Sequence, residues 1–205
     1  MRVLENCEPK RVFYYFEEIC KIPHGSGNTK QISDYLVDFA KKHGFDYVQD
    51  EMNNVVIYKP ASKGYENAPT VILQGHMDMV CEKRPGVEHD FEKDGLNLSV
   101  RDGYISANGT TLGGDDGIAV AYALALLDST DLPHPALEVL ITVDEEIGLL
   151  GAVGLDCSVL KGKRMINMDS EAEGSLWISC AGGLSAVSSI PVQRIEAEGT
   201  RLQVK

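Results

Sequence analysis

The segment VILQGHMD, residues 71–78, begins as an apolar run and ends with a histidine and an aspartate. Two later segments also begin as apolar runs and end with acidic residues: LEVLITVDEE at residues 137–146 and RMINMD at residues 164–169. Short apolar runs of this kind are typical of strands buried within an α/β sheet. We therefore predict three buried strands, each followed by side chains that can bind a metal. The expected strands cover residues 70–74, 137–143 and 164–168.

Helices are expected before and between these strands. Pro9 suits the first turn of a helix, and Gly44 suits the residue that ends one. The Asp102-Gly103 pair predicts a two-residue hairpin turn. Alternating helices and buried strands predict an α/β fold with a largely parallel central sheet flanked by helices. The expected helices cover residues 9–21, 29–43 and 118–127, and the further strands cover 45–49, 54–59, 98–101 and 104–107.

The composition excludes several classes of partner. The 205 residues are 43% apolar, which is enough for one sizeable core. With 19 basic and 31 acidic side chains the net charge is -12, which repels nucleic-acid phosphates and anionic membrane surfaces. No apolar run approaches the roughly 20 residues of a membrane span, and the N-terminal residues lack a secretory signal. We expect a cytoplasmic protein without nucleic-acid or membrane partners.

The cysteines give no sign of a disulfide framework or of a thiolate zinc site. There are five, an odd number, and they are widely spaced with no Cys-x-x-Cys pair. We expect reduced thiols.

Polar residues that follow the predicted strands should converge in space. In open α/β sheets, ligands bind beyond the carboxyl ends of the strands. The residues at those ends are His76, the acidic run 144–146 and Asp169. Imidazole together with carboxylates is the ligand set of a hydrolytic zinc, manganese or cobalt site.

Two acidic pairs add to this set. Asp115 and Asp116 follow two glycines, which let the backbone bring a carboxylate close to the strand ends. Glu145 and Glu146 are adjacent and point in different directions, so one could bind a metal while the other serves as general base. Taken singly, such residues also cap helices or form solvated turns. Their joint occurrence at three predicted strand ends and one glycine-rich loop favours a metal site.

Four motifs in order resemble a known family. They are HMD at residues 76–78, GDDG at 114–117, DEE at 144–146 and NMDSE at 167–171. The pattern resembles the two-zinc peptidase family of carboxypeptidase G, aminoacylase and the cytosolic dipeptidases. The phrases QGHMDMVCEK, TLGGDDGIAVA and TVDEEIGLLGA are most similar to its branch of bacterial aminoacyl-histidine (Xaa-His, cytosol non-specific) dipeptidases. The resemblance implies a metal-dependent hydrolase whose substrates are short peptides.

The resemblance also implies a role for each motif residue. His76 and Asp169 would bind one metal, Glu146 the other, and Asp115 would bridge them. The implied cofactors are two divalent ions, Zn²⁺ with Mn²⁺ or Co²⁺ as alternatives.

Two further residues would act beside the metals. Asp78 would orient the His76 ring, and Glu145 would be the general base that activates water. Asp116 stands where these dipeptidases often have asparagine, so Asp115 and Asp116 both stay candidates for the bridge.

In the family a lid and dimerisation domain is inserted into the catalytic domain, and the chain that follows supplies a last histidine ligand. We expect residues 1–185 to be the N-terminal portion of the catalytic domain and residues 186–205 to begin the inserted domain. The last ligand would then be missing from these 205 residues, which alone would have little activity. The full-length form would be a homodimer.

Two other functions fit the same motifs. A related aminoacylase or tripeptide aminopeptidase would use the same metal core. Alternatively, the chain could be a non-catalytic remnant that acts as a binding or assembly module.

Overall fold

The computed structural model describes residues 2–170, 174–180, 182, 186–193 and 199. The chain divides into two units, Met1–Glu171 and Ala172–Lys205. The helices and strands that the structure describes all lie in the first unit. The domain boundary that we predict after residue 185 falls beside residues 183–185, which lie outside the described part.

Five strands form the central sheet, in the order β1-β2-β6-β3-β7. β3 (Val71–His76) lies between β6 (Leu137–Thr142) and β7 (Arg164–Asn167) and is parallel to both. β2 (Val55–Lys59) pairs antiparallel with β6, and β1 (Asp46–Gln49) pairs antiparallel with β2. The predicted α/β fold with a parallel centre is confirmed, and its antiparallel part is the β1–β2 edge.

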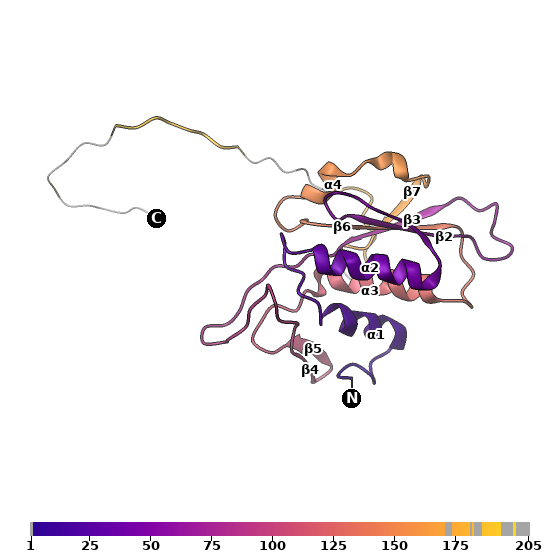
Figure 1. Ribbon diagram of the computed structural model, residues 1–205, viewed down its shortest axis with the longest axis horizontal. Helices are drawn as coiled ribbons and strands as arrows, with labels where there is room; N and C mark the ends of the chain where they lie inside the picture. The colour runs from indigo at the N-terminus through magenta and orange to yellow at the C-terminus, as the bar shows by residue number, and fades with distance from the viewer. Residues whose placement is uncertain (1, 171–173, 181, 183–185, 194–198, 200–205) are drawn as a thin grey trace. The chain divides into compact units, whose positions relative to one another are not determined.

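Helices cover the two faces of this sheet unequally. The long helices α1 (Lys10–Ile19), α2 (Lys30–His43) and α3 (Gly114–Asp128) lie together on one side of the strands, and the short α4 (Leu150–Gly154) lies on the other (Figure 1). The small 3-10 helix η1 (Cys157–Val159) follows α4. The larger core therefore lies under α1, α2 and α3.

Alternate residues along each strand enter different cores. On β2, Val55 and Ile57 point into the large core, whereas Val56 points into a small core on the opposite face. Val139 and Leu140 of β6 divide in the same way. This two-residue period is that of a strand covered on both faces, which explains why β2 and β6 are apolar over most of their length.

Helix α3 packs deeply because its inner residues are small or apolar. Ala119, Val120, Ala123, Leu124 and Leu127 are each 1% exposed or less. The alanines allow close approach to α1 and β3, both of which contact α3. The expected helix over 118–127 is thus present, but the observed helix begins at Gly114.

The hairpin predicted at Asp102-Gly103 is confirmed. β4 (Leu98–Arg101) and β5 (Tyr104–Ala107) pair antiparallel, and both turn residues have positive φ, 53° and 80°. A turn of this type matches the twist of its two strands.

The expectation that the third strand is buried is wrong for β7. Met165 and Ile166 are 52% and 54% exposed. Among the described residues β7 is an edge strand that pairs with β3 alone, and its apolar side chains remain exposed. No helix in the described part of the chain is long and apolar enough to cross a membrane.

Leu124→Ala should destabilise the protein by about 2–5 kcal/mol, because it leaves a cavity in the core between α3 and the sheet. Leu132 is 49% exposed, so Leu132→Ala makes the same chemical change without a cavity and should cost about 0.5 kcal/mol or less. Urea unfolding of the two variants measures the difference. Equal losses of stability would contradict the placement of this core.

Candidate metal centre

His76 is the last residue of β3 and is 1% exposed. Its ring nitrogen Nδ1 lies 3.0 Å from the backbone carbonyl oxygen of Asp78 and 3.4 Å from Oδ1 of the same residue. Both neighbours accept hydrogen bonds, so Nδ1 carries a hydrogen and donates it. Nε2, on the other side of the ring, is then the nitrogen that can bind a metal.

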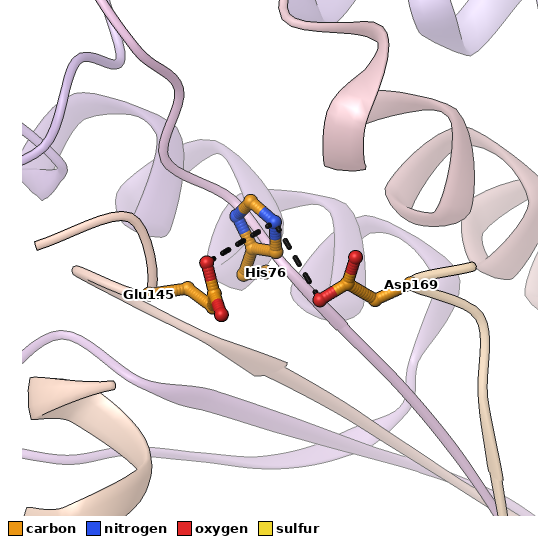
Figure 2. A group of neighbouring side chains, drawn as sticks. All are labelled: His76, Glu145 and Asp169. Atoms are coloured by element: carbon orange, nitrogen blue, oxygen red, sulfur yellow. Dashed lines mark ion pairs between the residues drawn. The ribbon is translucent and has the colours of Figure 1, made fainter. Parts of the chain in front are cut away.

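Carboxylates from three separate segments surround Nε2. Oδ1 of Asp115 lies at 3.1 Å, Oδ2 of Asp169 at 3.9 Å and Oε2 of Glu145 at 4.0 Å. Figure 2 shows Glu145 and Asp169 on either side of the His76 ring. The structure thus brings together residues that lie up to 93 positions apart in the sequence.

The donor atoms are close enough to share metal ions. There are three groups of three residues in which the possible ligand atoms all lie within 4.8 Å of one another. They are His76–Glu145–Asp169, His76–Asp115–Glu146 and Asp115–Asp116–Asp169. The groups share members, which is the arrangement that a pair of neighbouring ions requires, and their imidazole and carboxylate donors fit zinc, manganese or cobalt.

The register of the sheet explains why these residues meet. His76 is paired with Thr142 across β3 and β6, and Glu145 and Glu146 follow directly in the next turn. Gln74 is paired with Asn167 across β3 and β7, which places Asp169 level with His76. Both neighbours of β3 are parallel to it, so all three strands end at the same edge.

Asp78 ties the histidine to the acidic turn. Its carboxylate is fully buried, and Oδ1 accepts a hydrogen bond from the backbone N–H of Glu145 at 3.0 Å. Oδ2 accepts one from the hydroxyl of Ser26 at 2.7 Å and one from the backbone N–H of Glu146 at 3.3 Å. Burial works against ionisation, but the bonds from His76 and Ser26 outweigh it and lower the pKa of Asp78.

Asn54 also holds the acidic turn at residues 144–146, through backbone groups on both sides of it. Its side-chain oxygen accepts a hydrogen bond from Val143 N–H at 3.0 Å, and its amide donates to the carbonyl of Gly151 at 2.9 Å. A Cβ at Gly151 would lie 2.4 Å from the carbonyl oxygen of Val143, so glycine is required there. Asn54 is 1% exposed, and the sequence contains no motif that singles it out.

Asp115 and Asp116 take different positions, although they are adjacent and joined by a cis peptide bond. The Asp115 side chain is 52% exposed and faces Nε2 of His76. Asp116 is buried, and its Oδ2 accepts a hydrogen bond from the backbone N–H of His76 at 3.1 Å. A Cβ at Gly75 would meet that oxygen at 2.5 Å. Neither aspartate has helical dihedral angles, which is why α3 begins irregularly.

The concentration of carboxylates favours positive charge at the site. Burial opposes protonation of His76, but the carboxylates of Asp78 and Asp116 outweigh it and raise its pKa to about 9. Burial raises the pKa of Asp116 to about 7, helped by the charge of Asp169. Burial and neighbouring carboxylates also raise the pKa of both Glu145 and Glu146. A divalent cation would supply the missing positive charge.

The other histidines lie outside these groups of donor atoms in the described part of the chain. His24 is buried, and its Nδ1 lies 2.6 Å from the carbonyl oxygen of Ile22. His43 stacks on Phe39 and lies 3.5 Å from Asp128.

Comparison with known proteins agrees with the motifs. Residues 72–174 match the model of peptidase family M20/M25/M40. Over 194 residues the chain is 41% identical to the cytosol non-specific dipeptidase of Escherichia coli, covering 95% of this chain and 40% of that relative. The chain thus spans about two fifths of the length of this curated relative.

Solved structures give the same result. The aminoacylhistidine dipeptidase of Vibrio alginolyticus matches with a TM-score of 0.81 and 42% identity over 83% of this chain and 35% of that one. A tripeptidase from Staphylococcus aureus matches with a TM-score of 0.66 and 28% identity over 80% of this chain and 44% of that one. The resemblance inferred from the four motifs is confirmed.

Binding of a divalent metal at pH 7 should release protons. His76 binds a metal only as the neutral imidazole, and its pKa of about 9 keeps it protonated in the metal-free protein. Apparent affinity should therefore rise with pH, by up to about tenfold per unit, and level off above about pH 9. Calorimetric titration in buffers of different ionisation enthalpy counts the protons.

His134→Ala, outside the cluster, should leave proton release unchanged. Flat affinity between about pH 6 and pH 9 would contradict the assignment of His76 as a ligand.

Proposed function

The chain belongs to peptidase family M20/M25/M40, and on that premise we propose that the protein is a metal-dependent dipeptidase acting on Xaa-His or other short peptides. The observation that carries the proposal is the convergence of His76, Asp115, Glu146 and Asp169, with Glu145 among them. Two relatives with 41% and 42% identity are named as dipeptidases, which supports this substrate class.

We propose two metal ions held by this chain. His76 and Asp169 would hold one, Glu146 the other, and Asp115 would contact both. Asp115 suits the bridge better than Asp116, because its side chain faces Nε2 of His76 while Asp116 is engaged with the backbone of β3. When bound, Zn²⁺, or alternatively Mn²⁺ or Co²⁺, would lower the pKa of a water molecule enough for it to supply hydroxide near neutral pH, and hydroxide can attack a peptide carbonyl.

Glu145 would be the general base. Its side chain is 28% exposed, so it can reach solvent, and Asp78 fixes its backbone N–H. The raised pKa of Glu145 makes it a better proton acceptor than an ordinary glutamate. It would take a proton from the attacking water and give it to the amine that leaves. Asp78 would keep His76 turned with Nε2 toward the cluster.

The remaining features of the proposal concern the whole protein. Residues 1–185 would form the N-terminal portion of its catalytic domain, and residues 186–205 would begin a lid and dimerisation domain. The protein would act in the cytoplasm as a homodimer, with short peptides as substrates. The E. coli relative is named as a cytosolic enzyme, which supports the location.

A tripeptide aminopeptidase is the second candidate, favoured by the match to the S. aureus tripeptidase. Assays of the purified, metal-supplemented whole protein on an Xaa-His dipeptide, a tripeptide and an N-acyl amino acid separate the alternatives. We expect the highest kcat/KM for the dipeptide. A preference for the tripeptide or the acyl amino acid would replace the proposal, and no hydrolysis of any would favour a binding module.

Glu145→Gln should lower kcat by about 100- to 10,000-fold, because a general base contributes that much to proton transfer. Its metal content should stay at the wild-type level. Glu146→Gln, the adjacent and equally conservative change, should instead reduce metal content. Kinetics on the dipeptide and elemental analysis of both variants give the two readouts. If Glu145→Gln kept full activity, the general base would have to be another group.

A further inference from the structure

The loop between α1 and α2 lies directly beside the segment that follows β3. Gly25 forms a parallel bridge with Met79. Met79 N–H donates to the carbonyl of His24 at 3.2 Å, and Ser26 N–H donates to the carbonyl of Met79 at 3.3 Å. A Cβ at Gly25 would lie 2.4 Å from Sγ of Cys81, so glycine allows this close approach. The loop is thereby carried to the edge of the metal centre.

At that point the hydroxyl of Ser26 donates to Oδ2 of Asp78 at 2.7 Å. The other donor to this oxygen, the N–H of Glu146, is longer at 3.3 Å. The opposite oxygen, Oδ1, faces Nδ1 of His76 and the N–H of Glu145. The Asp78 carboxylate is fully buried, so water does not readily replace a lost donor.

We propose that Ser26 is a positioning residue of the metal centre, acting through Asp78 on His76 and on the turn that carries Glu145 and Glu146. The assignment rests on the proposed function, since the centre is the site of the proposed hydrolysis. Without the Ser26 hydroxyl, the Asp78 carboxylate can rotate about its Cβ–Cγ bond. Oδ1 then moves away from Nδ1 of His76, and the ring is no longer held with Nε2 toward the carboxylates.

The loop itself does not depend on this hydroxyl. Gly27 N–H donates to Oδ1 of Asp144 at 2.7 Å, and Asn28 N–H donates to the carbonyl of Gly25 at 2.8 Å. These bonds and the bridge to Met79 involve backbone groups of the loop, so Ser26→Ala leaves them in place. The effect of that variant can therefore be assigned to the hydroxyl rather than to loss of the loop.

The test compares Ser26→Ala with Ser26→Thr, which retains a hydroxyl. Ser26→Ala should weaken metal binding by about tenfold, the lower end of the range for partners of metal ligands. It should also change the visible absorption spectrum of the Co²⁺-loaded protein and lower kcat with KM unchanged. Ser26→Thr should stay within about twofold of wild type in metal affinity, on the same scale. A competing chelator measures the affinities.

Ser99→Ala is the matched control, because Ser99 also donates its hydroxyl to a side-chain oxygen, that of Asn108, in the β4–β5 hairpin. It should leave metal affinity and the Co²⁺ spectrum unchanged. Wild-type affinity and spectrum in Ser26→Ala would overturn the inference. So would a loss in Ser26→Thr equal to that in Ser26→Ala. If Ser26→Ala does not fold, Ser26→Gly decides, since it also lacks the hydroxyl and should bind the metal more weakly than wild type.

The outcomes separate this inference from the proposed function. Weaker metal binding in Ser26→Ala, together with a wild-type protein that hydrolyses no dipeptide, would support the role of Ser26 and refute the dipeptidase. Unchanged metal binding in Ser26→Ala, together with dipeptide hydrolysis by the wild type, would refute the role of Ser26 alone.

Discussion

The parallel register of β3 with its two neighbours is the constraint on which the metal centre depends. It sets His76 opposite Thr142 on β6 and level with Asp169, two residues beyond the Asn167 that pairs with Gln74. A shift of one residue in either pairing would turn the following side chains to the other face of the sheet. The large core under α1, α2 and α3 resists such a shift, because it would bury the wrong side chains. Packing and chemistry are thus linked through the same strands.

A second constraint is electrostatic. The carboxylates around one imidazole repel one another, and burial makes their charges more costly, as the raised pKa values of Asp116, Glu145 and Glu146 show. Such a cluster is stable only when cations or protons compensate it. Asp78 is the exception, since its surrounding hydrogen-bond donors stabilise the charged form. The centre therefore combines one carboxylate, that of Asp78, which stays ionised and orients its neighbours, with several carboxylates whose negative charge a bound cation would stabilise.

Much of the fold and of the metal centre could be predicted from the sequence. Apolar runs that end in ligand-type residues identify the three strands, and Asp102-Gly103 identifies the hairpin. The exposure of β7 could not be predicted, because it depends on what covers the strand rather than on its own residues. Ser26 and Asn54 were also missed, since a single hydrogen bond between distant residues leaves no periodic pattern. The separation of Asp115 from Asp116 required the backbone path at the start of α3. Glu171, the last residue of the fourth motif, lies outside the described residues.

The central claim is that these strand ends hold metal ions, and metal content per chain tests it most directly. Elemental analysis of the purified whole protein should find about two divalent ions per chain, as expected for a site with a bridging carboxylate. His76→Ala and Asp115→Ala should each lose metal while keeping the wild-type fold by circular dichroism. Wild-type metal content in both variants, or no metal in the wild type after loading and desalting, would contradict the account.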